Sequence, residues 1–259
     1  LVTWFIINQT NLSHMMISGW NKKYSEILKE FKYNEKQDAE SAIILDSILR
    51  ESVSLKKINN LIKGKTVFVI GAGPSLSLAI PVLKNFETTL KIVADSAVKP
   101  LVENGIKPDI IVTDLDGDED SLLRVGKTNS IFVVHAHGDN IAKLCLAENF
   151  KNCVGTTQTK SFKNIQNFGG FTDGDRAVFL ASYFDAKKII LFGMDFGKRI
   201  GKYSQTKISE RKTKLKKLRK SKVLLEWLSK KSRSQLFTTS SPIRGFEKIS
   251  YRELDIIIT

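Results

Sequence analysis

The chain has 259 residues, of which 42% are hydrophobic and 26% are charged. These fractions are close to those of globular proteins and exclude a fibrous or intrinsically disordered chain. The length predicts one large domain or two unequal ones. The formal net charge of +14 predicts an anionic partner, such as a phosphorylated substrate, a nucleic acid or a membrane surface.

The apolar runs and the cysteines bear on where the protein works. The longest runs, such as 66–70 and 188–192, are far shorter than the about 20 residues that a membrane-spanning helix needs. The first residues, LVTWFII, lack the basic start of a secretory signal. Cys145 and Cys153 match neither a zinc site nor a disulfide framework, so we expect both to be inert. We therefore expect a cytoplasmic protein without membrane contact.

The N-terminal region, 1–64, is predicted to be helical. Between Asn21 and Leu61 apolar residues recur at helical spacing, and no proline or glycine interrupts them. We expect two helices that end near Gly64.

From Lys65 onward, short β-branched runs alternate with helical patterns. The runs are VFVI, LKIVA, DIIVT, SIFVVH, NCVGT and KIILFG. Such alternation indicates parallel βαβ units. We therefore predict an α/β fold with a Rossmann-like, doubly wound, mainly parallel sheet as the catalytic domain at 65–202. Residues 203–259 are predicted to complete it with a long basic helix within 203–233 and a C-terminal strand at LDIII.

The residues after the six runs are polar or glycine. Ligands of doubly wound sheets bind at the carboxyl ends of the strands, so one edge of the sheet is predicted to be a site. The first such segment, GAGPS at 71–75, offers main-chain N–H groups and a helix N-terminus to phosphate. A tight strand-to-helix turn without a ligand is an equally common explanation. Asp95 lies where a dehydrogenase has its ribose-binding acid, but Leu76 replaces the third glycine of the dinucleotide fingerprint.

The segment PDIIVTDLDGD places acidic residues at the end of a predicted strand. Carboxylates as close as Asp114 and Asp116 repel each other unless a cation binds. Mg²⁺ commonly uses one or two carboxylates together with substrate phosphates. An acidic turn that caps the next helix is the alternative, and we expect Asp118 to be such a cap.

Two further motifs carry candidate charged groups. His135, His137 and Asp139 of HAHGDN are expected to contact phosphate or to donate a proton near a leaving oxygen, unless one histidine only supports the loop. Arg176 falls in the first turn of a predicted helix, where the helix dipole disfavours a cation. Its position predicts an anionic partner such as a triphosphate, and an ion pair with Asp173 or Asp175 is the alternative.

Six motifs taken together resemble one family. GAGPS, PDIIVTDLDGD, HAHGDN, GTTQT, GFTDGDRAVFLA and GMDFG occur in the order and spacing of the archaeal 6-hydroxymethyl-7,8-dihydropterin diphosphokinases, which are related to the catalytic domain of thiamine diphosphokinase. The resemblance covers about 65–197. It implies Mg²⁺-dependent transfer of diphosphate from ATP to a reduced pterin, with release of AMP, on a route to folate-type or methanopterin-type cofactors.

The resemblance also implies roles for single residues. The implied metal ligands are Asp114, Asp116 and Asp95. Catalytic roles fall to Asp114, Asp116, His135, His137 and Arg176. Nucleotide and pterin would be held by Gly71, Gly73, Pro74, Ser75, Asp95, Asp139, Gln158, Asp173 and Asp175, of which Gln158, Asp173 and Asp175 are the candidates for the pterin pocket.

Other functions remain as alternatives. A nucleotide-sugar-dependent glycosyltransferase would use acids and metal in a similar way, and a thiamine diphosphokinase would need a second β-sandwich domain that the sequence does not indicate. A nucleic-acid-binding protein would use the basic run 211–222, but this run has few aromatic residues. A solvated basic face, or a lysine-rich flap that attracts ATP, explains the run equally well. Formation of a homo-oligomer is compatible with each of these functions.

Overall fold

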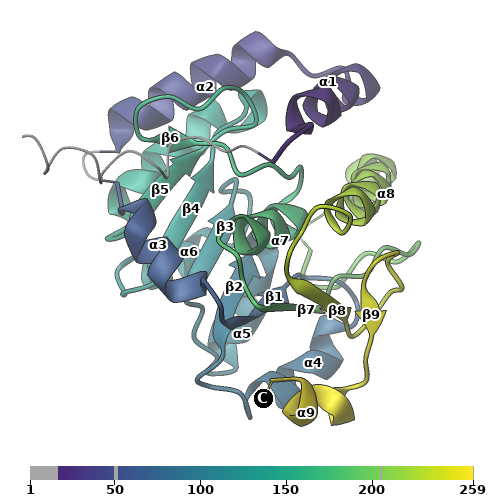
Figure 1. Ribbon diagram of the computed structural model, residues 1–259. Coiled ribbons are helices and arrows are strands. Elements are labelled where there is room, and N and C mark those ends of the chain that lie inside the picture. Colours follow the sequence, from purple (N-terminus) through teal and green to yellow (C-terminus); the bar gives the residue numbers. More distant parts are fainter. Residues whose placement is uncertain (1–16, 50–51, 205, 259) are drawn as a thin grey trace, which may run out of the picture.

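The computed structural model describes residues 17–49, 52–204 and 206–258, so LVTWFII and His14 lie outside the described part. In that part, nine parallel strands form one sheet (Figure 1). Their order across the sheet is β6-β5-β4-β3-β2-β1-β7-β8-β9. The strands are β1 Thr66–Ile70, β2 Leu90–Ala94, β3 Ile110–Thr113, β4 Ile131–His135, β5 Cys153–Thr156, β6 Ile165–Gln166, β7 Lys188–Phe192, β8 Gln235–Thr238 and β9 Glu247–Lys248.

All six strands predicted from β-branched runs are confirmed, as β1 to β5 and β7. The predicted C-terminal strand is wrong, because LDIII forms the short helix α9, Leu254–Ile258. A local signal accounts for the helix: Ser250 and Glu253 form a capping box just before it. Leu254 is buried in the core, and β9 already pairs with β8 at this side of the sheet.

Helices cover both faces of the sheet, as expected for a doubly wound fold. Alternate residues of one strand enter different cores, for example Val67 on one face and Phe68 on the other. One core contains α1, α3, α7 and α8; the other contains α2, α4, α5, α6 and α9. Their bounds are α1 Trp20–Phe31, α2 Glu35–Ile48, α3 Leu55–Ile62, α4 Leu76–Leu83, α5 Val98–Glu103, α6 Glu119–Gly126, α7 Asp173–Tyr183 and α8 Arg211–Leu228.

The described N-terminal region forms three helices, whereas two were expected. Lys32 ends α1 in a left-handed conformation with a φ angle of 58°. Asn34 then caps α2 by accepting a hydrogen bond from the Lys36 N–H, and Ser54 caps α3 in the same manner. Periodicity alone did not reveal these breaks, because polar capping residues interrupt the helical pattern without proline or glycine.

The order of the strands creates a topological switch point beside β1. The chain builds the sheet outward from β1 to β6 and then returns to place β7 on the other side of β1. Connections on the two sides of such a point lead to opposite faces of the sheet, which leaves a crevice at the carboxyl ends of the strands. The loops after β1, β2, β3 and β7 surround this crevice.

The predicted basic helix is α8, which contains eight lysine and arginine residues. Its apolar side packs into the core through Leu224, Leu225 and Leu228. Lys220 pairs with Glu30 of α1 at 2.9 Å, so part of the basic charge fastens α8 to the N-terminal helices. No helix in the described ranges is long and apolar enough to cross a membrane.

A fully buried carboxylate, Asp175, joins α7 to α8. Its oxygens accept hydrogen bonds from the N–H groups of Phe171 and Thr172 at 2.7 and 2.8 Å, which caps α7. The Ser221 hydroxyl of α8 also donates to Asp175, at 2.8 Å. A buried acid in this position therefore fixes the angle between the loop, α7 and α8.

We expect Asp175→Ala to lower the free energy of unfolding by about 2–4 kcal/mol, because it leaves buried donors without an acceptor. Urea unfolding followed by circular dichroism measures the change. Asp120→Ala, in the exposed first turn of α6, is the control and should stay within about 0.5 kcal/mol of the original chain. Equal stability of the two variants would contradict a structural role for Asp175.

Candidate active site

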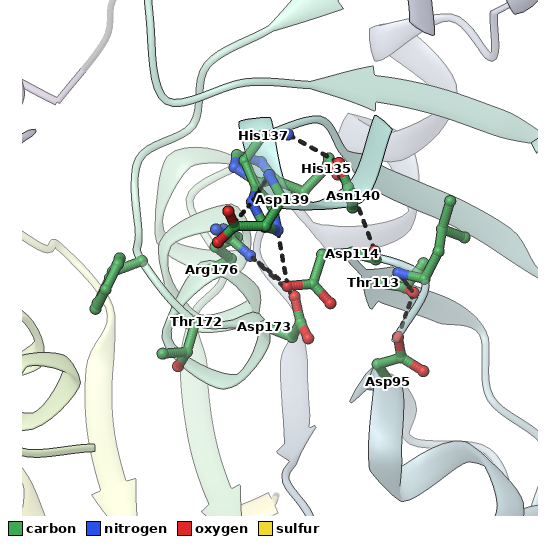
Figure 2. Close-up of polar contacts among 12 residues, drawn as sticks. Asp95, Thr113, Asp114, His135, His137, Asp139, Asn140, Thr172, Asp173 and Arg176 are labelled. Atoms are coloured by element: carbon green, nitrogen blue, oxygen red, sulfur yellow. Dashed lines mark hydrogen bonds and ion pairs between the residues drawn. The ribbon is translucent and has the colours of Figure 1, made fainter. Parts of the chain in front are cut away.

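Four carboxylates meet at the carboxyl edge of the sheet. Asp95 follows β2, Asp114 and Asp116 follow β3, and Asp173 begins α7; one ligand atom of each lies within 4.8 Å of the others. Figure 2 shows Asp114 and Asp173 approaching from different elements. The sequence predicted three members of this cluster. It did not predict Asp173, which was expected in the pterin pocket.

The backbone after β3 turns sharply so that Asp114 and Asp116 both reach the cluster. Between them, Leu115 has a left-handed conformation with a φ angle of 67° and a buried side chain. This conformation is uncommon for a residue other than glycine and stores strain. The Thr113 hydroxyl stabilises the turn by accepting from the Leu115 N–H at 2.7 Å and donating to Asp95 at 2.5 Å.

Asp95 lies beneath this turn. The Gly117 N–H donates to Asp95 Oδ2 at 3.1 Å. A Cβ at position 117 would stand only 1.7 Å from Asp95 Oδ1, so glycine is required for the chain to approach the acid this closely. The glycine of the DLDGD motif is therefore explained by the close packing of position 117 against Asp95.

The four acids differ in their tendency to ionise. Burial, and then repulsion by Asp116 and Asp114, raises the pKa of Asp95 to about 7. Partial desolvation and the Asp114 charge raise the pKa of Asp116 to about 6, and burial raises that of Asp173 well above its usual value. The pKa of Asp114 is lowered although burial opposes ionisation, because His137 and Arg176 stabilise its negative charge.

Two oxygens of the cluster are suited to a cation. Asp95 Oδ1 and Asp114 Oδ1 are buried and have no hydrogen-bond partner in the structure. Buried polar atoms are nearly always satisfied, so orphaned acceptors beside two further carboxylates require an explanation. A hard divalent cation such as Mg²⁺ prefers this all-oxygen donor set. The residues present therefore fit a metal.

His137 holds Asp114 in place. Its Nε2 lies 3.3 Å from Asp114 Oδ2, and its Nδ1 accepts the Asp139 N–H at 3.2 Å, which assigns the ring proton to Nε2 (Figure 2). Asn140, which sequence reasoning missed although it ends the HAHGDN motif, donates to the carbonyls of Asp114 and His135 at 2.8 and 2.7 Å. The loops after β3 and β4 are thus locked together.

The catalytic role of His135 stays a prediction, and the surroundings of the ring favour the alternative of a supporting residue. The ring is buried, Nδ1 contacts Thr156 Oγ1 at 3.1 Å, and Nε2 contacts the Gln158 amide nitrogen at 3.1 Å. Burial lowers the pKa of His135 well below its usual value. Both ring nitrogens are occupied, so His135 supports Gln158 and the loop, which is the alternative left open for one histidine.

Arg176 is paired with the acidic cluster. Its Nη1 donates to Asp173 Oδ1 at 3.0 Å and lies 4.0 Å from Asp114 Oδ2. The side chain is only 7% exposed, and its Nε has no partner within the described part of the chain. The ion pair with Asp173 was one of the two expected explanations. The unpaired Nε leaves donor capacity for an anion.

GAGPS lines the site in a different manner from that predicted. Gly71 and Gly73 donate their N–H groups to the Phe192 and Gly193 carbonyls at 2.8 and 2.7 Å. The Ser75 N–H and hydroxyl donate to Asp195 at 2.9 and 2.7 Å. These three N–H groups are therefore not free to hold phosphate. The glycines instead permit close packing of the first loop against the loop after β7.

Asp175 does not belong to a substrate pocket. It is fully buried and its oxygens cap α7, so the expectation that it contacts pterin is corrected. Gly73, Pro74 and Asp139 line a cavity in the crevice, and the side chain of Asp139 is 66% exposed. Asp118 caps α6 by accepting from the Ser121 N–H at 3.1 Å, as predicted.

The crevice contains a cavity of about 630 Å³, a size typical of small-molecule sites. The four acids form part of its wall, and α8 covers it with Lys214, Lys217 and Leu218. Lys217 lies 5.7 Å from the Tyr33 ring and 5.9 Å from the Phe171 ring. Sequence reasoning missed Tyr33, Phe171 and Lys217 as site residues, because they are far apart along the chain.

Fold and site together define the class: a doubly wound α/β protein with an acidic cation-type site at its topological switch point. The family described as "6-hydroxymethylpterin diphosphokinase MptE-like" matches residues 44–201. The chain belongs to this family.

Individual relatives agree with the family match. A 6-hydroxymethyl-7,8-dihydropterin pyrophosphokinase of Methanocaldococcus jannaschii is 44% identical over 235 residues, which cover 84% of this chain and 97% of the relative. The protein of the same name from Pyrococcus furiosus is 41% identical over 228 residues, covering 85% and 97%.

A solved structure shows the same fold. MAf glycosyltransferase from Magnetospirillum magneticum AMB-1 superposes with a TM-score of 0.57 and 17% identity. The match covers 73% of this chain and 34% of that protein. At this identity the likeness concerns the fold alone.

We expect Asp95→Asn to make the metal-free protein more stable at neutral pH, by on the order of 2 kcal/mol. The raised pKa of Asp95 lets the folded state bind more protons than the unfolded state between about pH 4 and its pKa of about 7, so stability falls as pH rises through this window. The amide removes this dependence, and its NH₂ group can donate to the neighbouring carboxylates.

Urea unfolding in the presence of a chelator, at about pH 5 and about pH 7.5, measures both effects. Asp120→Asn, on the exposed start of α6, is the control for removal of an acid elsewhere. A decline in stability between the two pH values as steep in Asp95→Asn as in the original chain would contradict the assigned electrostatics.

Proposed function

We propose that the protein transfers the β,γ-diphosphoryl group of Mg²⁺-bound ATP to the hydroxymethyl oxygen of 6-hydroxymethyl-7,8-dihydropterin, releasing AMP. The observation that carries the proposal is the four-acid cluster in the wall of a 630 Å³ cavity, at the switch point of a chain of this family. The names of the curated relatives support the same acceptor.

The reaction requires charge stabilisation more than covalent chemistry. The acceptor oxygen attacks the β-phosphorus, the bond from that phosphorus to the oxygen bridging it to the α-phosphate breaks, and the hydroxyl proton is lost. Negative charge spreads over the non-bridging oxygens, where fixed positive groups are most effective. Asp95, Asp114, Asp116 and Asp173 would hold Mg²⁺, which supplies positive charge to the phosphate oxygens when bound.

Cationic side chains orient the acids and attract the phosphates. His137 and Arg176 keep Asp114 ionised and oriented. Lys214 and Lys217 line the cavity from α8 and bring cationic charge to the cavity that the acids also line. Arg176 pairs with Asp173 beside these groups, and its Nε has no partner among the described residues. In this proposal the four acids attract the metal ion, and the two lysines of α8 attract the phosphates of the nucleotide.

Purified protein is expected to form AMP from ATP and Mg²⁺ only when the reduced pterin is present. Asp116→Asn should lower kcat by at least about 100-fold with little change in thermal stability, since it removes a cavity-facing carboxylate. Asp118→Asn is the matched control and should retain activity, because asparagine also caps helices. Chromatography of the nucleotides measures turnover, and AMP formation with thiamine but not with pterin would refute the proposal.

Removal of the positive charge of Lys217 should lower the catalytic efficiency without unfolding the chain. We expect Lys217→Met to lower kcat/KM for ATP by about 10–100-fold, because the methionine keeps the apolar stem and loses the ammonium group. Lys212→Met is the control: Lys212 is on the same helix, is exposed and lines neither described cavity. Equal kinetics for the two variants would exclude a phosphate role for Lys217.

A further inference from the structure

A second, smaller cavity of about 120 Å³ adjoins the large one. Five residues line both cavities, which makes the smaller one a side chamber of the same site: Tyr33, Asp114, Asp139, Phe171 and Lys217. Asp114 is the one member of the four-acid cluster that lines both. A group bound in the side chamber therefore lies next to the acids while the large cavity remains open to a nucleotide.

The wall of the side chamber combines two aromatic rings, which it shares with the large cavity, with polar groups that line only the side chamber. Tyr33 and Phe171 supply aromatic rings whose centroids lie 6.3 Å apart at an angle of 50°. Gln37 and Gln158 contribute amide side chains that both donate and accept hydrogen bonds. Arg176 also lines this chamber, and its buried Nε has no partner. Apolar rings with convergent polar groups are typical of a pocket for a flat heterocycle.

Residues 32–38, which we call the α1–α2 turn and which include the first turn of α2, close this chamber. Gln37 lies over Gly138 so closely that a Cβ at position 138 would be 2.8 Å from the Gln37 Cβ. Asp38, the next residue, accepts from the Gly138 N–H at 2.9 Å and from the Tyr24 hydroxyl at 2.7 Å. These contacts fix the turn on the loop after β4, so the wall formed by Tyr33 and Gln37 is held in place.

We propose that the side chamber is the subsite for the acceptor ring, a planar pterin, and that the α1–α2 turn provides its selectivity. This inference rests on the proposed function and adds the location and the recognition elements of the acceptor. The ring packs against Tyr33 and Phe171, and its ring N–H, amino, carbonyl and ring-nitrogen groups pair with the amides of Gln37 and Gln158. Its hydroxymethyl arm extends past Asp114 toward the β-phosphate.

The geometry favours this assignment over the reverse one. A chamber of 120 Å³ is too small for a nucleoside triphosphate, whereas 630 Å³ lies within the range of common ligand sites. Lys214 lines only the large cavity, whereas Lys217 lines both cavities and Arg176 only the side chamber, so a phosphate chain in the large cavity meets Lys214 and Lys217. The match to the family begins at residue 44, so the α1–α2 turn lies outside the segment on which the family assignment is based.

Two reciprocal variants test the subsite. Gln37 is exposed to solvent and lines only the side chamber, so Gln37→Trp should fill that chamber and leave the fold intact. Ser209 is exposed and lines only the large cavity, so Ser209→Trp should obstruct the nucleotide. Lys36→Trp is the matched control, because Lys36 neighbours Gln37 on α2, is exposed and lines neither cavity.

Steady-state kinetics with both substrates varied should separate the variants. We expect Gln37→Trp to raise KM for the pterin by about tenfold or more and to leave KM for ATP within about twofold. Ser209→Trp should show the opposite pattern, and Lys36→Trp should match the original chain. An unchanged pterin KM in Gln37→Trp, or an increase in its ATP KM alone, would overturn the subsite.

Binding without turnover distinguishes this inference from the proposed function. The probe is oxidised 6-hydroxymethylpterin, which is fluorescent and needs no ATP for a titration. If the original chain forms no AMP with the reduced pterin but binds the probe, and Gln37→Trp weakens this binding about tenfold, the proposed transfer fails and the subsite stands. If turnover occurs and the two proteins bind the probe equally, the transfer stands and the subsite fails.

Discussion

The mutual repulsion of four carboxylates is the constraint on which the rest of the site depends. Asp95, Asp114, Asp116 and Asp173 lie close together at an edge where water is partly excluded. The structure counters the repulsion unevenly: Arg176 and His137 stabilise the charge on Asp114, while the pKa values of the other three are raised. Such a cluster costs stability in isolation, and a bound cation removes the cost. The acids that would bind a cation are therefore also the groups that lower the stability of the metal-free protein.

The local backbone geometry at the carboxyl edge of the sheet keeps the four acids close together. Leu115 adopts a left-handed conformation although it has a bulky side chain, and Gly117 passes directly over Asp95. Asn140 secures the arrangement by donating to the carbonyls of Asp114 and His135, which joins the loops after β3 and β4. Strain of this kind persists only where surrounding contacts determine it. Here the buried β3 strand and the Thr113 hydroxyl hold the turn, so the rigid sheet positions the acids.

Sequence reasoning succeeded where a signal was local. Six strands were predicted because each is a short β-branched run, and Asp95, Asp114 and Asp116 were found because they directly follow such runs. It failed where the partner is distant: nothing near GAGPS shows that Gly73 bonds the Gly193 carbonyl, or that Thr156 and Gln158 occupy the two nitrogens of His135. β6, β8 and β9 were missed: β6 and β9 have only two residues each, and β8, QLFT, contains no run of β-branched residues.

The position of α8 explains what part of the positive charge of the chain does. Lys220 and Lys216 reach α1, where Lys220 pairs with Glu30 and Lys216 donates to the Glu30 carbonyl at 2.6 Å. Lys214 and Lys217 turn instead toward the crevice. One set of cations on the helix thus fastens the N-terminal helices, and another lines the cavity that the four acids also line. α1 leads directly into the α1–α2 turn, which carries Tyr33 and Gln37. The contacts between α8 and Glu30 of α1 therefore also help to position the wall of the side chamber.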